Sequence, residues 1–321
     1  MKALVCHEFG PINHLRFGEM KIPTITSEEL LIKVSYCGVN FPDTLIVEGK
    51  YQFKPELPFV PGGEVSGVVE QVGDKVKDFK PGDKVIAAMG WGGFAEFAVA
   101  SAHNTFHFHP KDDLKKGSVM LETYGTAMHA LKDRAQLSKG EALVVLGAAG
   151  GTGTAAVQLG KVLGATVIAV AGSEDKLAFA KDAGADHLIN YQNTDLKESL
   201  KDHGGVDIVF DPVGGDASEA AFRALKPGGR HLVVGFASGT IPNLPWNLPL
   251  LKSASIVGVF WGHFWRNQPE ANRKNIEQLL KWLNHHEIDP RITKTFKLSE
   301  GIEALNMLKG RKALGKIVLS T

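Results

Sequence analysis

A glycine-rich stretch, LVVLGAAGGTGTAAVQLGK (Leu143–Lys161), joins an apolar run to a segment with helical spacing. It could bind phosphate groups, or it could be only a tight turn between a buried strand and a buried helix. A triphosphate-binding P-loop requires two glycines around four residues, followed directly by Lys and then by Ser or Thr. Here Gly153 is followed by Thr154 and Ala155, and the first lysine is Lys161, two helical turns later. The sequence therefore excludes a P-loop.

The same stretch fits the phosphate-binding turn of a dinucleotide-binding fold. Its three glycine positions hold Ala148, Gly150 and Gly153, after an expected strand and at the start of an expected helix. Ala148 is compatible with the turn if its backbone torsions stay in an ordinary region. Gly150 would let the backbone approach a pyrophosphate, and Gly153 would let the helix pack closely on the strand. The N–H groups at the helix start, including those of Gly151 and Thr152, would then bind the phosphates.

The next expected strand ends in AVAGSEDK, which distinguishes between two dinucleotides. Folds that bind NAD place an acidic residue about 20 residues after the glycine loop, where it accepts hydrogen bonds from the ribose 2′-hydroxyl. This chain has Ala171, Gly172 and Ser173 at that place, with Lys176 one turn later. A hydroxyl and an ammonium group without a carboxylate favour the 2′-phosphate of NADPH. Ser173 could also cap the helix expected over residues 174–183, and the two roles are compatible.

Histidines cluster in AHNTFHFHP, where His107 and His109 would share one face of a strand. Such a spacing can chelate a metal ion. No carboxylate or thiolate lies beside them in the sequence, so solvated surface histidines are the preferred interpretation. The same interpretation applies to His285 and His286, near an expected helix end.

Short apolar runs alternate with amphipathic segments from Gly140 to about Phe260, as parallel βα units require. The expected strands are ALVVLG, ATVIAVA, DHLIN, VDIVFD, RHLVVGF and SIVGVF, and the expected helices include TAAVQLGKVLG, EDKLAFAKDAG and SEAAFRALKPG. Six strands joined by five connections predict an α/β fold with an open, doubly wound parallel sheet.

The first part of the chain, to about Leu121, has a different pattern. Its short alternating strands, LLIKVSYCGVN, EVSGVVEQVG, DKVIAAM and FAEFAVA, are separated by Gly and Pro turns and predict a mainly antiparallel β domain. The tail beyond Phe260 holds an expected helix, strand, helix and strand: NRKNIEQLLKWLNHH, TKTFKL, SEGIEALNMLKG and GKIVLS. These elements are too few for a third core, so we expect the tail to pack onto the first domain, with a ligand-binding cleft between the two domains.

The composition is that of an ordinary soluble chain long enough for two domains, with 321 residues, 44% of them hydrophobic and 22% charged. Lys and Arg (36) nearly balance Asp and Glu (35), so neither nucleic acid nor an anionic membrane is an expected partner. The start MKALVCHEFG and the later segments lack the apolar runs of a signal peptide or a membrane span. Cys6 and Cys37 are too few for a disulfide framework, and we expect an unexported, cytoplasmic protein.

Several stretches together resemble the zinc-independent quinone oxidoreductases of the medium-chain dehydrogenase/reductase superfamily, along essentially the whole chain. They are GVNFPDTL, PFVPGGEVSGVVEQVG, KPGDKVIA, YGTAMHAL, GAAGGTGTAAVQLGK, GADHLINY, DPVGG and GKIVL. The resemblance implies a GroES-like catalytic domain over residues 1–122 and 261–321, with a Rossmann NADPH-binding domain over residues 123–260. It also implies a homodimer, and SASIVGVF, as the expected edge strand, would pair with its symmetry mate.

The resemblance predicts no zinc. Zinc-dependent relatives place a catalytic cysteine near the position of Asn40 and a histidine in the PG-H-E segment, where this chain has Gly63. Cys37 lies three residues early, and the four-cysteine structural zinc loop of those relatives is missing. A second tyrosine that many relatives carry two residues after Asp43 is Leu45 here, which puts a two-tyrosine polarising scheme in doubt.

Residue by residue, the resemblance places Asn40, Asp43 and Tyr51 around the nicotinamide and the substrate as catalytic residues, with Asn40 also at the cofactor. Three residues are implied at the adenosine 2′-phosphate: Ser173, Lys176 and Tyr191. The other residues implied at the cofactor are Thr126, Phe236, Ala237, Ser238, Phe260, Trp261, Arg311 and Lys316.

These residues also have simpler interpretations. Asn40 and Asp43 could organise the turn after the strand LLIKVSYCGV, because their side chains suit turns. Tyr51 could be an ordinary, partly buried loop aromatic. Arg311 and Lys316 could be surface charges that flank the last strand.

The sequence as a whole predicts hydride transfer from NADPH to an activated conjugated carbonyl, first of all a quinone, with the proton supplied by solvent or a hydroxyl. Asn40 and Tyr51 are the expected hydrogen-bond donors to the developing oxyanion. An enoyl reductase acting on an unsaturated ketone, aldehyde or acyl thioester needs the same hydride delivery, and no residue separates the two activities. A non-catalytic NADPH-binding protein is the alternative from another class.

Overall fold

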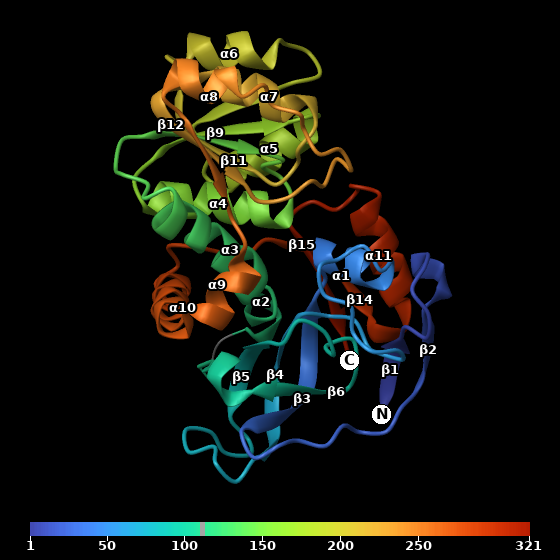
Figure 1. The fold of residues 1–321 in the computed structure, drawn as a ribbon. Helices are drawn as coiled ribbons and strands as arrows, with labels where there is room; N and C mark the ends of the chain where they lie inside the picture. Colours follow the sequence, from blue (N-terminus) through green and yellow to red (C-terminus); the bar gives the residue numbers. More distant parts are fainter. Residues whose placement is uncertain (110–112) are drawn as a thin grey trace. The chain divides into compact units, whose positions relative to one another are not determined.

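The computed structural model describes residues 1–109 and 113–321, which form two compact units (Figure 1). Unit 1 comprises Met1–Glu122 and Pro290–Thr321, and unit 2 comprises Thr123–Asp289. The sequence pattern instead predicts the second boundary after residue 260. The helix at the start of the tail, α10 (Pro269–Asn284), packs within unit 2, against α9 (Trp261–Asn267) and α3 (Gly125–Met128). The assignment of the units as catalytic and cofactor-binding domains stays a prediction.

Unit 2 is built on a six-stranded parallel sheet in the order β10-β9-β8-β11-β12-β13. Its strands are β8 (Ala142–Leu146), β9 (Thr166–Ala171), β10 (His187–Asn190), β11 (Val206–Asp211), β12 (Leu225–Val233) and β13 (Ser255–Gly258). The chain runs outward from β8 to β10 and then continues on the other side of β8, which is the doubly wound order. The predicted fold class and all six predicted strands are confirmed.

Helices cover the sheet of unit 2, and Figure 1 shows α4 on one side with α6, α7 and α8 on the other. The helices around the sheet are α4 (Gly151–Val162), α5 (Glu174–Asp182), α6 (Leu196–Asp202), α7 (Asp216–Arg223) and α8 (Asn247–Lys252). With both faces covered, β8 is almost completely buried, as its continuous apolar run requires. The helix expected over residues 218–228 ends at Arg223, because β12 begins at Leu225 and continues through the Lys-Pro-Gly-Gly segment. No helix in the described ranges is long and apolar enough to cross a membrane.

Unit 1 is a mainly antiparallel β structure, as predicted. In its described part, seven strands form one sheet in the order β14-β15-β3-β4-β5-β7, with β6 also paired to β3, and β1 and β2 form a separate pair. The strands are β1 (Lys2–Val5), β2 (Arg16–Glu19), β3 (Glu29–Gly38), β4 (Glu64–Val72), β5 (Lys84–Ala88), β6 (Phe97–Ser101), β7 (Thr105–His107), β14 (Ile292–Lys297) and β15 (Lys316–Ser320). The helices are α1 (Phe41–Val47), α2 (Leu114–Gly117) and α11 (Gly301–Lys309).

The ends of three strands in unit 1 meet and position the polar residues described below. Gly38, the last residue of β3, is paired with Glu64 at the start of β4 and with Val318 of β15. Asn40 follows β3 by two residues, and Lys316 is the first residue of β15. The pairing register therefore gathers residues that are far apart in the sequence at one end of the sheet.

Candidate functional site

A buried lysine lies at the centre of a polar cluster in unit 1. Lys316 is only 4% exposed, and its ammonium group donates to the Val39 carbonyl oxygen at 3.1 Å. It also donates to Asn40 Oδ1 and lies 3.3 Å from Glu64 Oε1. A buried ammonium requires such compensation because it has lost its hydration. Lys316 is thus no surface charge, and its contacts are with Asn40 and Glu64.

Glu64 is held as a carboxylate by donors from three segments. Its Oε1 accepts from Asn40 Nδ2 at 2.9 Å as well as from Lys316. Its Oε2 accepts from the backbone N–H groups of Leu121 and Glu122, each at 3.0 Å. Hydrogen bonds to the ionised form stabilise that form, so Glu64 is the counter-ion of the buried lysine. Glu64 was not among the predicted site residues, although an acidic residue at the start of the apolar run EVSGVV could have indicated it.

Asp43 connects α1 to the loop before β4. Its Oδ2 accepts from the Asn40 N–H at 2.7 Å, and its Oδ1 accepts from the Gly62 N–H at 3.2 Å. Both contacts agree with the simpler interpretation, in which Asn40 and Asp43 organise this turn. Burial raises the pKa of Asp43 to about 7, although these N–H donors and Lys316 oppose the rise. Asp43 can therefore exchange a proton near neutral pH.

Glu122 is the third carboxyl group of the cluster and was not predicted. Burial raises the pKa of Glu122 well above its ordinary value, and the nearby charges of Glu64 and Asp43 add to the rise. Its Oε1 would overlap with a Cβ atom placed on Gly63. The Glu122 carboxyl group therefore fills the space that a side chain at residue 63 would need. A carboxyl group that keeps its proton can donate a hydrogen bond at neutral pH.

The thiol next to this cluster is inert. Cys37 is completely buried, and its Sγ donates to the Glu64 carbonyl oxygen at 3.0 Å. Burial and the neighbouring carboxyl groups raise the pKa of Cys37 well above its ordinary value, so it stays a thiol. Across residues 1–109 and 113–321, no group of three or more His, Cys, Asp or Glu side chains is arranged to hold a metal ion. His107, one of the weighed metal ligands, contacts the Asp78 carbonyl oxygen at 2.8 Å and stacks on Phe79.

Two further predicted residues of unit 1 lie in other segments. Tyr51 follows α1, is partly buried against the core of the unit, and has its ring centroid 6.4 Å from that of Phe53. Arg311 is an exposed residue between α11 and β15, with a left-handed backbone (φ 56°). Their predicted roles at the substrate and the cofactor stay predictions.

The glycine-rich loop of unit 2 has the geometry that a pyrophosphate site needs. Gly147 takes the left-handed position of the turn (φ 62°), so Ala148 keeps an ordinary backbone, as the prediction required. A Cβ atom on Gly153 would overlap with the Gly147 carbonyl oxygen. Position 153 therefore requires glycine, because the helix packs closely against this turn. Helix α4 begins at Gly151, and the N–H groups of its first turn have no acceptor within the helix. A dinucleotide phosphate fits this helix start, with Gly150 at the entry.

The end of β9 brings two of the residues predicted at the 2′-phosphate together. Ser173 stands at the N-cap position of α5, but its side chain makes no capping hydrogen bond. The Tyr191 hydroxyl lies 2.8 Å from the position of a Cβ atom on Gly172, so the ring covers the residue beside Ser173. Lys176 lies in the first turn of α5. Ser173 and Tyr191 thus lie at the carboxyl end of β9, where positions 171, 172 and 173 hold no carboxylate.

The remaining predicted cofactor residues lie in three segments of unit 2. Thr126 is half-buried in α3. The loop Phe236–Ser238 is tied to the turn after β11, because the N–H groups of residues 237 and 238 donate to the carbonyl oxygens of residues 212 and 213 at 3.1 and 2.8 Å. Phe260 is exposed before α9, whereas Trp261 is buried and donates from Nε1 to Asn272 Oδ1 at 2.9 Å.

Comparisons with known proteins agree with both units. Residues 26–111 match the alcohol dehydrogenase GroES-like domain, and residues 151–284 match the zinc-binding dehydrogenase family. A bovine quinone oxidoreductase-like protein 2 is 38% identical over 315 residues, which cover 94% of this chain and 90% of the relative. The human quinone oxidoreductase is 32% identical over 325 residues, which cover 99% of this chain and 97% of the relative.

Solved structures show the same likeness over the full length. The mycobacterial protein Rv1454c complexed with NADPH has a TM-score of 0.94 and 30% identity, with all of both chains covered. The Escherichia coli quinone oxidoreductase complexed with NADPH has a TM-score of 0.93 and 25% identity, again with both chains fully covered. With the motifs and the geometry of both units, these matches show that the chain belongs to the zinc-independent quinone oxidoreductase family of the medium-chain dehydrogenase/reductase superfamily.

Proposed function

We propose that this NADPH-dependent oxidoreductase transfers a hydride to a quinone, or to a similarly activated conjugated carbonyl, without zinc. The observation that carries the proposal is the arrangement around Asn40 and Gly63. Asn40 is bonded to Lys316 and Glu64, and the Glu122 carboxyl group fills the space beside Gly63. The resemblance implies that zinc-dependent relatives carry a metal-ligating cysteine near the position of Asn40 and a histidine at the position of Gly63. An acceptor that is already electron-poor does not need a Lewis acid.

NADPH fits the described geometry of unit 2. Its pyrophosphate would lie at the first turn of α4, where Gly150 and Gly153 allow close approach. Ser173, Lys176 and Tyr191 would bind the 2′-phosphate at the end of β9. When bound, the cofactor supplies the hydride, and the residues of the chain supply orientation and hydrogen bonds.

The roles proposed in unit 1 come from the resemblance to the family, in which Asn40 and Tyr51 donate hydrogen bonds to the acceptor oxygen as negative charge develops there. In the structure Asn40 Nδ2 donates to Glu64 Oε1, so this role requires Nδ2 to exchange that bond for one to the acceptor. Asp43 holds the backbone at Asn40 through the bond from the Asn40 N–H and is a positioning residue in that sense. A quinone that receives one hydride and one proton becomes a hydroquinone, and the proton comes from solvent or from a hydroxyl group.

The proposal extends to a homodimer formed through the edge of the unit 2 sheet. Strand β13 pairs with β12 on one side only and ends the strand order. Its Ile256 is 41% exposed, and Leu250 and Leu251 of the preceding helix α8 are exposed as well. An unpaired edge strand next to exposed apolar side chains favours pairing with another copy of the chain.

A panel of acceptors tests the proposed substrate class. We expect purified protein to oxidise NADPH rapidly with 1,4-benzoquinone and much more slowly with cyclohexenone or crotonyl-CoA. A preference for cyclohexenone or crotonyl-CoA would replace the proposal by an enone or thioester reductase. NADPH binding without turnover of any of the three acceptors would support a non-catalytic binding protein.

A further inference from the structure

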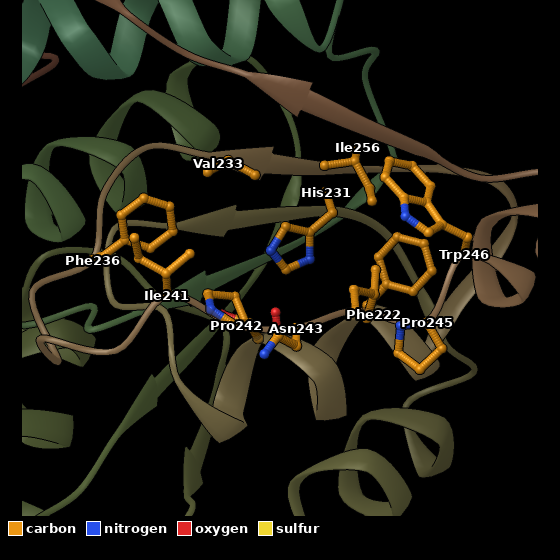
Figure 2. A pocket seen from close by; sticks show the side chains of 12 residues that line it. Phe222, His231, Val233, Phe236, Ile241, Pro242, Asn243, Pro245, Trp246 and Ile256 are labelled. Atoms are coloured by element: carbon orange, nitrogen blue, oxygen red, sulfur yellow. The ribbon is translucent and has the colours of Figure 1, made fainter.

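Unit 2 contains a cavity of about 540 Å³ that no step of the proposed redox reaction uses (Figure 2). Its walls come from α7, from β12 and β13, and from the segment between residues 236 and 246. Most of the lining is apolar or aromatic, including Phe222, Trp246 and Ile256. Of the residues predicted at NADPH, only Phe236 reaches it. The volume and lining are those of a small-molecule pocket with few polar groups.

One wall of the cavity carries a buried histidine whose orientation is fixed by Asp211. Asp211 Oδ1 accepts from the N–H groups of Val213 and Gly214, each at 2.8 Å. Its Oδ2 accepts from Ser218 Oγ and contacts His231 Nε2 at 3.0 Å. Burial opposes ionisation, but the bonds from His231, Ser218 and Gly214 lower the pKa of Asp211 below its ordinary value. An ionised carboxylate only accepts hydrogen bonds, so His231 Nε2 carries the hydrogen.

The other ring nitrogen of His231 has no partner. His231 is 5% exposed, and among the described residues Nδ1 is the only buried side-chain nitrogen or oxygen without a hydrogen bond. In a neutral imidazole protonated at Nε2, Nδ1 is an acceptor. Figure 2 shows the ring among the lining side chains, with Phe236 and Ile241 on one side and Trp246 on the other. Buried polar atoms are nearly always paired, so this acceptor calls for a donor inside the cavity.

We propose that the cavity is a second binding site, specific for a small aromatic molecule that carries a hydroxyl group, a phenol. The hydroxyl group would donate to His231 Nδ1, and the ring would pack against Phe222, Phe236 and Trp246. Trp246 is 84% exposed, and an aromatic ring in the cavity would cover part of its side chain. The inference does not rest on the proposed hydride transfer, since the binding needs no cofactor and no turnover.

Calorimetry with a matched pair of ligands tests the hydroxyl preference. Protein saturated with NADPH at pH 8 is titrated with 2-naphthol and with 2-methoxynaphthalene, which has the same rings but no donor. We expect one molecule of 2-naphthol to bind per chain, about tenfold more tightly than the ether. Equal affinities, or binding of 2-naphthol only when NADPH is absent, would each overturn the proposal.

Three variants locate the binding. The change His231→Phe keeps an aromatic ring and removes the acceptor, so it should abolish the preference for 2-naphthol over the ether. Trp246→Ala, at an exposed position, should lower the affinity for both ligands and keep the preference for 2-naphthol over the ether. This variant tests the site even if His231→Phe fails to fold. Leu188→Ala removes an exposed apolar side chain on the opposite edge strand, β10, that does not line the cavity, and it should change neither affinity. Unchanged binding by Trp246→Ala would contradict the assignment.

A second copy of the chain is the competing occupant of the cavity mouth, because Ile256 lies on the edge strand β13. Sedimentation of the same samples separates the two cases. We expect 2-naphthol to bind without a change in oligomeric state. Binding confined to a monomeric fraction, or dissociation of an oligomer by 2-naphthol, would show that a second copy covers the cavity and would overturn the proposal.

Discussion

At the scale of single residues, the central feature is a set of three buried carboxyl groups that interact with the charge of one buried lysine, Lys316. Glu64 receives the hydrogen bonds of an ionised group, including those from Lys316 and Asn40. One ammonium cannot neutralise two further carboxylates, and burial favours the uncharged form of both Asp43 and Glu122. The pKa values of Asp43 and Glu122 are therefore raised, close to the residues proposed to act on the substrate.

Replacing Glu122 by Gln tests whether this carboxyl group is protonated. Its pKa in the folded protein lies above the unfolded value, so the folded wild type retains a proton that the unfolded chain loses above about pH 4.3. This costs the wild type stability as the pH rises, and glutamine has no such cost. We expect the unfolding midpoint of E122Q to exceed that of the wild type by roughly 2–4 °C at pH 8, and the difference to vanish near pH 4.

The control for this experiment is E56Q, which changes an exposed glutamate of the same unit and should leave the midpoint unchanged at both pH values. If E122Q were less stable than the wild type at pH 8, Glu122 would be an ionised partner of Lys316. That result would contradict the proposed protonation state.

Ser173 offers a residue-scale test of the cofactor. Aspartate is also a good N-cap residue, so Ser173→Asp should not harm α5. Its negative charge would repel the 2′-phosphate, and we expect NADPH to bind about tenfold more weakly or worse, with a smaller effect on NADH. Fluorescence titration measures both affinities. The control Thr166→Asp adds the same charge at the other end of β9 and should bind NADPH with the wild-type affinity. An unchanged NADPH affinity of S173D would refute the assignment.

Sequence reasoning could find some of these residues and not others. Asn40, Asp43 and the glycine-loop residues stand in local motifs that a pattern can identify. Glu64 and Glu122 matter because β3, β4 and β15 bring them to Lys316, and pairing between strands remote in sequence leaves no local pattern. Lys316 was predicted as a site residue, but its burial was not predicted, because a lysine at the start of a final strand is usually exposed.

At the scale of elements, the turn from β8 into α4 contains two glycines with different roles, one in packing and one in the proposed cofactor binding. Gly153 is required by packing, since a Cβ atom there would overlap with the Gly147 carbonyl oxygen. Gly150 has an extended backbone (φ −79°). A Cβ atom placed on Gly150 would lie 3.4 Å from the Gly147 carbonyl oxygen, its nearest neighbour. The structure thus tolerates a side chain at Gly150, whereas the proposed pyrophosphate does not.

Alanine substitutions distinguish the packing role of Gly153 from the proposed pyrophosphate-binding role of Gly150. We expect Gly153→Ala to lower the unfolding midpoint by several degrees, because the helix must shift by about the size of a methyl group. Gly150→Ala should keep the wild-type midpoint and bind NADPH at least about tenfold more weakly. Thermal unfolding and NADPH titration of both variants give the answer. Wild-type affinity in G150A would argue against a pyrophosphate at this turn.

The elements of unit 2 were predictable because parallel strands buried on both faces are continuous apolar runs. The exceptions have physical causes. The Lys-Pro-Gly-Gly segment, residues 226–229, suggests a turn from its residue types, yet β12 begins before it, at Leu225. The boundary expected after residue 260 lies instead between Asp289 and Pro290, because the amphipathic helix α10 buries its apolar face against α3 and α9.

At the scale of the whole molecule, the proposed assembly depends on one edge of one sheet. Strands β10 and β13 are the two edges of the unit 2 sheet, and each carries an exposed apolar residue, Leu188 and Ile256. We expect Ile256→Lys to convert a dimer into monomers, because a buried, unpaired ammonium is costly in an interface. Leu188→Lys, on the opposite edge, should leave the dimer intact. Sedimentation equilibrium measures the oligomeric state of the wild type and both variants. A wild type that stays monomeric at all concentrations would contradict the proposed dimer.

Zinc-independent hydride transfer to a quinone is tested by the turnover of 1,4-benzoquinone with NADPH before and after removal of metals. The protein is dialysed against a strong chelator, its zinc content is measured, and hydroquinone formation is followed together with NADPH oxidation. We expect one hydroquinone per NADPH at an unchanged rate in zinc-free protein. Loss of turnover on chelation, with recovery when zinc is returned, would contradict zinc-independent transfer.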